Sequence, residues 1–141
     1  MNQNWIFIPA LMQVLLTLIV FIMLNAAKSK ALKLGQVDEE RRALHTDAWP
    51  EYVLKISNNI GNQFETPVLF YALSFILWAL NAVDSFAMML ALGYVIIRIL
   101  HAYIHIGSNY LPLRRRVFTI GTMLLLLMTI LCFSKVIAAL M

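Results

Sequence analysis

Four long apolar segments constrain this chain more than any other feature of its sequence. A helix that crosses a bilayer needs about 20 mostly apolar residues, and segments of that length occupy residues 5–24, 58–80, 86–106 and 117–140. The apolar runs are continuous, as in helices, and lack the alternation of β-barrel strands. The sequence therefore predicts an all-α integral membrane protein. Its four helices would form an up-down bundle, with residues 1–141 as one transmembrane domain.

The composition excludes a soluble globular domain. Hydrophobic residues make up 62% of the chain and charged residues 13%, against about 45–50% and about 25% in soluble domains. A globule of this length leaves roughly a third of its unfolded surface exposed, so it cannot hide so much apolar side chain from water. The chain has one cysteine, and disulfide-stapled folds need pairs. Lipid is the solvent that this composition requires.

The basic residues predict an orientation in the membrane. Nine of the eleven Lys and Arg residues lie in two segments, six between the first two spans and three between the last two. The positive-inside rule makes residues 25–57 and 107–116 cytoplasmic and places both termini on the opposite side. We expect a multi-pass protein of a bacterial inner membrane or an endomembrane. No nucleic-acid partner is expected, because orientation explains the charge.

Polar side chains at the start of the second span form a first candidate cluster. Asn58, Asn62 and Glu65 are spaced i, i+4 and i+7, so they share one helical face. Pro67 removes a backbone donor and favours a kink. The amides could simply mark the interfacial start of the span. Glu65 lies deeper, where an ionisable group costs about 2.5–3.5 kcal/mol, and indicates a site or a structural ion pair.

The third span carries a second polar stripe. Tyr94, Arg98, His101 and His105 follow at i, i+4, i+7 and i+11 along one face. Arg98 lies at a depth comparable to that of Glu65 on the antiparallel neighbour, and we expect an Arg98–Glu65 ion pair that offsets both burial costs. The pair would be either purely structural or part of a polar pocket. A metal site is not expected, because the chain has too few histidines with suitable spacing.

Three consecutive arginines, Arg114 to Arg116, open the fourth span. One interpretation is a topology signal that contacts anionic lipid head groups. Alternatively, Arg114 turns inward. A guanidinium is always charged and favours a thiolate, so the pKa of a bound thiol would fall from about 8.5 toward neutrality.

Together these features resemble the MAPEG family, the membrane-associated proteins in eicosanoid and glutathione metabolism. The resemblance covers the whole chain and rests on residues 62–66 (NQFET), 98–101 (RILH) and 112–114 (PLR). The chain looks like a bacterial-type or divergent member near the microsomal prostaglandin E synthase and microsomal glutathione transferase branch. This implies a homotrimer that binds glutathione between adjacent subunits near the cytoplasmic face. Carried over by position, the resemblance implies Arg114 as catalytic residue and cofactor contacts at Asn62, Glu65, Arg98 and His101.

The chain departs from the family pattern at two places, and these add Lys55 and His105 to the predicted cofactor-binding residues. Eicosanoid-synthesising members place arginines ahead of the Asn-x-x-Glu segment, where this chain has Asn58 and Gly61. Lys55 is the candidate substitute for them. His105 stands where relatives carry a tyrosine one turn beyond the histidine of the third span.

The leading functional hypothesis is a glutathione-dependent transferase or peroxidase that acts on lipophilic electrophiles arriving from the bilayer. One alternative is a non-catalytic lipid-binding or structural member of the family. Another is a small multidrug-type transporter, a class that also has four short spans and a carboxylate in the membrane. Glutathione binding would separate the first hypothesis from the others.

Overall fold

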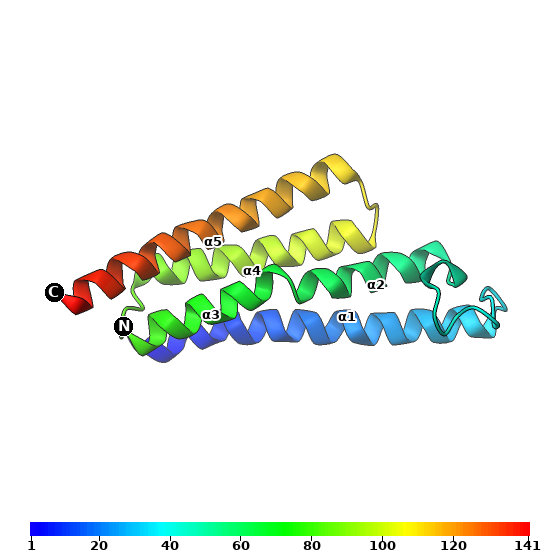
Figure 1. The fold of residues 1–141 in the computed structure, drawn as a ribbon, viewed down its shortest axis with the longest axis horizontal. Coiled ribbons are helices and arrows are strands. Elements are labelled where there is room, and N and C mark those ends of the chain that lie inside the picture. Colours follow the sequence, from blue (N-terminus) through cyan, green and yellow to red (C-terminus); the bar gives the residue numbers. More distant parts are fainter.

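The computed structural model describes all 141 residues, and its regular elements are all helices. The helices run alternately up and down in an elongated bundle (Figure 1), which confirms the all-α prediction. The elements are η1 (Gln3–Ile6), α1 (Phe7–Lys33), η2 (Thr46–Ala48), α2 (Glu51–Gln63), α3 (Thr66–Ala79), α4 (Ser85–Ile106) and α5 (Leu111–Leu140).

Three helices are long and apolar enough to cross a membrane. They are η1 continued by α1 (Gln3–Lys33), α4 and α5, and they contain the predicted spans 5–24, 86–106 and 117–140. Most of the large apolar side chains on α1 and α5 are exposed, as expected for helices that face lipid. The structure thus supports a membrane protein with three candidate transmembrane helices.

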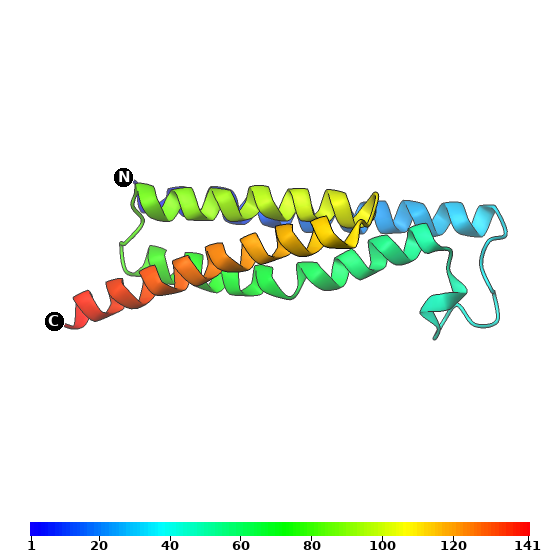
Figure 2. The ribbon, with the colours of Figure 1, turned by 90° about the horizontal axis from the view of Figure 1, so that it is seen from above.

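The second predicted span is not one helix. Residues 58–80 fall on α2 and α3, which follow one another with an interruption at Phe64 and Glu65 (Figures 1 and 2). The prediction of a continuous span is therefore wrong, whereas the expected distortion at Pro67 is present. Pro67 lies in the first turn of α3, where its missing N–H removes no helical hydrogen bond. Deeper in a continuous helix it would have clashed with a carbonyl of the preceding turn.

The two ends of the bundle differ in charge. Both termini lie at one end, with the short α3–α4 connection (Figure 1). The long α1–α2 loop and the α4–α5 loop lie toward the other end, where Lys28 to Lys55 and Arg114 to Arg116 are found. All the residues used to predict orientation are thus on one side of the bundle. Which membrane face that side occupies stays a prediction.

Helix α4 is central, because it packs against α1, α2 and α5. The approach to α5 is close at Gly121, where an added Cβ would lie 3.3 Å from Cγ2 of Ile97. Small residues at such crossings are how membrane helices gain packing contacts without a hydrophobic driving force. On the α3 side, the ring of Phe70 stacks on that of Tyr94 with centroids 4.7 Å apart, and both side chains are fully buried.

The end opposite the basic loops is fixed by polar contacts. Oδ1 of Asp84 accepts a hydrogen bond from the amide of Ala87 at 2.9 Å, which caps α4. The Lys135 ammonium on α5 lies 3.2 Å from Oδ2 of the same carboxylate. The Ala87 amide, followed by Lys135, holds the pKa of Asp84 below its ordinary value. The carboxylate therefore joins the start of α4 to the end of α5.

Replacing Asp84 with Ala should lower the free energy of unfolding by about 1 kcal/mol at neutral pH, the usual value of an N-cap. Because the pKa of Asp84 is lower in the folded state, its stabilisation is complete above the unfolded pKa of about 3.9. It disappears as the pH falls through the lowered pKa. Thermal unfolding in detergent across this range measures the difference. Asp84→Asn is the matched control, since asparagine caps equally well but does not titrate. A constant Asp84→Ala deficit down to acidic pH would contradict the role assigned to the carboxylate.

Candidate functional site

The interruption between α2 and α3 is held by two side chains of α4. Nη2 of Arg98 donates a hydrogen bond of 2.8 Å to the carbonyl of Asn62, in the last turn of α2. One turn earlier on α4, the hydroxyl of Tyr94 donates to Oγ1 of Thr66, the first residue of α3, at 3.1 Å. A broken helix frees backbone carbonyls, and cationic side chains at a helix C-terminus satisfy them. Arg98 and Tyr94 therefore hold the two sides of the break.

The expected Arg98–Glu65 ion pair does not form. No carboxylate lies within ion-pair distance of Arg98, which is 2% exposed, while Glu65 is exposed on the surface of the protomer. The reason is the break itself, because Glu65 is the N-cap of α3 and its backbone is no longer helical. Because α2 ends at Gln63, Asn58 and Asn62 share a helical face but Glu65 does not belong to it.

A hollow of about 250 Å³ opens beside this break, between α2, α4 and α5. It brings together three residues predicted from the sequence, Asn62, His101 and Arg114. The His101 ring lies 5.6 Å from the ring of Phe118, measured between centroids. Nη1 of Arg114 donates to Oδ1 of Asn109 at 2.6 Å, which fixes one end of its guanidinium. The hollow is lined by Asn62, His101, Arg114, Arg115, Phe118 and Thr119.

Two buried polar atoms next to the hollow have no partner. Nδ1 of His101 makes no hydrogen bond, although this residue is 3% exposed and lines the hollow. Nε of Arg98 also has no partner. The same guanidinium donates through Nη2 to the carbonyl of Asn62, which lines the hollow. Buried polar atoms without partners are rare and costly in native proteins. Of the two residues with unpaired atoms, only His101 lines the hollow, so a polar ligand there would lie against His101 and not against Arg98.

A second buried polar assembly links α1, α2 and α4 through amide side chains. Nε2 of Gln13 donates to Oε1 of Gln63, and Nε2 of Gln63 donates to Oδ1 of Asn59, each at 2.9 Å. Nδ2 of Asn59 lies 3.2 Å from Nδ1 of His105. In this direction of donation His105 accepts at Nδ1 and carries its proton on Nε2. All four side chains are buried, so His105 is held by the protein interior and does not line the hollow.

The Tyr94–His105 stripe of α4 faces the interior as predicted, since all four side chains are buried. Lys55 lies away from the hollow and forms an ion pair of 2.8 Å with Glu51. Its ammonium holds the pKa of Glu51 below the ordinary value, mainly through their hydrogen bond. The structure thus gathers Asn62, His101 and Arg114, keeps Arg98 and His105 next to them, and leaves Glu65 and Lys55 apart.

The amide chain and half of the residues that line the hollow were not predicted from the sequence. Asn59 and Gln63 continue the buried face of Val53 and Ile56 on α2, and this 3–4 residue spacing was the signal that would have found them. The predicted face of Asn58 and Asn62 is adjacent to this buried face, one residue away along α2. The lining residues Arg115, Phe118 and Thr119 follow Arg114 on α5 at helical spacing.

The chemistry of the hollow suits an anionic, partly apolar ligand. Its lining includes two arginines and no acidic residue. Along α5 it continues into apolar surface around Phe118, Met123 and Leu126, and a further apolar groove lies between α3 and α5. No three His, Cys, Asp or Glu side chains come together in a way that could hold a metal ion. The site therefore combines a cationic head region with an apolar wall.

Comparison with known proteins gives one match. The family whose sequence model matches the chain is described as the MAPEG family, and the match covers residues 6–134. No match was found among curated proteins or among solved structures.

Replacing Asn59 with Ala should lower the free energy of unfolding by about 1–3 kcal/mol, because it leaves Gln63 and His105 with unpaired buried groups. Asn58→Ala is the matched control, since Asn58 is the neighbouring asparagine but is exposed. We expect the control to change stability by less than about 0.5 kcal/mol. Unfolding of both variants in detergent tests the amide chain, and equal losses would rule it out.

Proposed function

The chain belongs to the MAPEG family, and from that premise we propose that it is a membrane enzyme that binds glutathione. It would transfer this thiol to lipophilic electrophiles, or use it to reduce their peroxides. The observation that carries the proposal is the hollow in which Asn62, His101 and Arg114 meet without any acidic residue. Glutathione carries carboxylates and an ionisable thiol, and a cationic lining without acidic residues favours these anionic groups.

The polar groups around the hollow fit such a ligand. His101 lines the hollow, and its Nδ1 has no hydrogen-bond partner within the protein. Arg115 adds a second guanidinium, which can bind a carboxylate with two parallel hydrogen bonds. Asn62 supplies an amide that both donates and accepts. These residues would hold the tripeptide, and the apolar surface along α5 would hold the second substrate.

Glutathione, when bound, supplies a nucleophilic thiol. Arg114 is the residue that we propose to favour the thiolate, because a guanidinium stays charged in any surroundings. Its hydrogen bond to Asn109 restrains the side chain before the ligand arrives, so little ordering is needed on binding. Phe118 and the apolar surface beyond it would exclude water, which strengthens the electrostatic effect of Arg114.

A homotrimer is part of the proposal. Glu65 is exposed at the start of α3, and polar groups at membrane depth face protein or water and not lipid. A neighbouring subunit would cover Glu65 and bring its carboxylate near the ligand, where it would bind the ammonium group of glutathione. Lys55 stays paired with Glu51. The basic end of the bundle would then face the cytoplasm.

One observation favours a second candidate, a non-catalytic lipid-binding or structural member of the family. Arg98 and His105 are both used in hydrogen bonds within the protein, to Asn62 and Asn59. In that case the polar stripe of α4 exists only to hold the broken α2–α3 segment. Glutathione binding decides between the two candidates.

Arg114→Ala should abolish the thiolate signal of bound glutathione. Each unit by which the thiol pKa rises cuts the thiolate fraction near neutral pH about tenfold. The measurement is the ultraviolet thiolate absorbance of glutathione bound to purified protein, followed as a function of pH. Arg116→Ala is the matched control, because Arg116 belongs to the same arginine run but does not line the hollow.

Two results would contradict the proposal. Wild-type protein that binds no glutathione at millimolar concentration would favour the non-catalytic candidate. Equal loss of the thiolate signal in both arginine variants would show that general positive charge, and not Arg114, stabilises the thiolate.

A further inference from the structure

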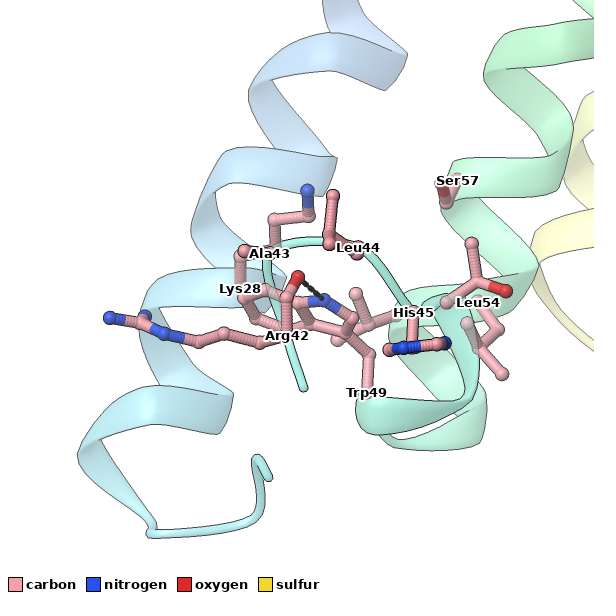
Figure 3. Close-up of a pocket in the computed structure, with 10 residues that line it drawn as sticks. Lys28, Arg42, Ala43, Leu44, His45, Trp49, Leu54 and Ser57 are labelled. Atoms are coloured by element: carbon pink, nitrogen blue, oxygen red, sulfur yellow. Dashed lines mark hydrogen bonds between the residues drawn. The ribbon is translucent and has the colours of Figure 1, made fainter. Parts of the chain in front are cut away.

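The loop between α1 and α2 folds back against both helices and borders a second, partly open pocket of about 200 Å³ (Figure 3). Lys28 of α1 lies on one side, His45 and Thr46 come from the loop, and Ser57 comes from α2. Trp49 lies between these elements. This pocket shares no residue with the hollow beside the helix break.

The pocket contains a cation without a counter-charge. The ammonium of Lys28 lies over the ring of Trp49, 4.9 Å from its centroid, and forms no ion pair. No lining residue is acidic. The acidic residues of the loop and of the start of α2, except Glu40, are already paired with Arg41, Arg42 or Lys55. Lys28 is therefore free to bind an anion.

The remaining walls are arranged around this cation. The Arg42 side chain points away from the pocket (Figure 3), while its backbone carbonyl accepts a hydrogen bond of 3.3 Å from the indole N–H of Trp49. That bond fixes the ring on which Lys28 rests. His45, Thr46 and Ser57 add polar groups that can bind an oxyanion. The lining thus combines one charge, several hydrogen-bonding groups and an aromatic ring.

The depth of the pocket indicates the source of the anion. The apolar run of residues 5–24 spans about 30 Å as a helix, the thickness of the hydrocarbon core. Lys28 follows four residues later, about 6 Å beyond the hydrocarbon edge. That is the level of the lipid phosphates, where aromatic side chains such as Trp49 also concentrate. Leu44, at 90% exposure, also lines this pocket and adds exposed apolar surface to it.

We propose that this pocket binds the phosphate of an anionic phospholipid headgroup. Lys28 supplies the charge, Trp49 holds Lys28 in place, and Thr46 and Ser57 donate hydrogen bonds to the phosphate oxygens. The bound lipid would fasten the α1–α2 loop to the membrane surface. This assignment is independent of glutathione binding, since neither the residues nor the ligand are shared.

The test is native mass spectrometry of the full-length protein in detergent, with equal phosphatidylglycerol and phosphatidylcholine added. We expect the protein to retain phosphatidylglycerol preferentially. Lys28→Gln should weaken this retention about fivefold, the effect of one basic residue near an anionic surface. Lys33→Gln is the matched control, because Lys33 is an exposed lysine of the same helix outside the pocket.

A second variant keeps the test valid if Lys28→Gln fails to fold. Ser57→Leu fills the pocket without changing its charge and should weaken retention as well. Equal effects of Lys28→Gln and Lys33→Gln, or unchanged retention in Ser57→Leu, would show diffuse surface charge and overturn the pocket. Displacement of the lipid by inorganic phosphate at comparable concentration would overturn the lipid as the source of the anion.

Discussion

The hydrogen bond from Arg98 to the carbonyl of Asn62 is the interaction on which the rest of the structure depends. A helix can be interrupted at membrane depth only where the freed backbone groups find partners inside the protein. Arg98 provides that partner for the end of α2, and Tyr94 binds the first side chain of α3. Because Pro67 requires the interruption and α4 stabilises it, α2 ends where its last turn borders the hollow beside α5.

The polar stripe of α4 serves two purposes along its length. Its first half, Tyr94 and Arg98, holds the break. The two histidines of its second half have different roles. His105 is hydrogen-bonded to the chain of buried amides, whereas His101 lines the hollow and its Nδ1 is unpaired. Buried polar groups are stabilising when satisfied and costly when not. Tyr94, Arg98 and His105 therefore stabilise the fold, whereas His101 is the member of the stripe that lines the hollow beside Arg114.

Helical spacing predicted the stripe of α4, and apolar runs predicted three long continuous helices, although α1 and α5 extend beyond the predicted spans 5–24 and 117–140. Helical spacing failed at the second span, since the spacing that joined Asn62 to Glu65 assumed an unbroken helix. The break turns Glu65 to the surface and gives Arg98 a carbonyl in place of a carboxylate. Pro67 indicated a distortion of the helix. The sequence could not predict which backbone carbonyl Arg98 would bind, because that depends on the packing of α4 against the break. The buried amide Gln63 was not predicted, because it does not share the helical face of Asn58 and Asn62.

A double-mutant cycle tests most directly whether Arg98 serves the break and not a carboxylate. Glu65→Gln, Arg98→Leu and the combination of both would be compared by reversible unfolding in detergent. If Arg98 binds the carbonyl of Asn62, the single effects should add to within about 0.5 kcal/mol, with nearly all of the loss coming from Arg98→Leu. A coupling energy above about 1 kcal/mol would mean that the two charges are in contact and would contradict the assigned role of Arg98.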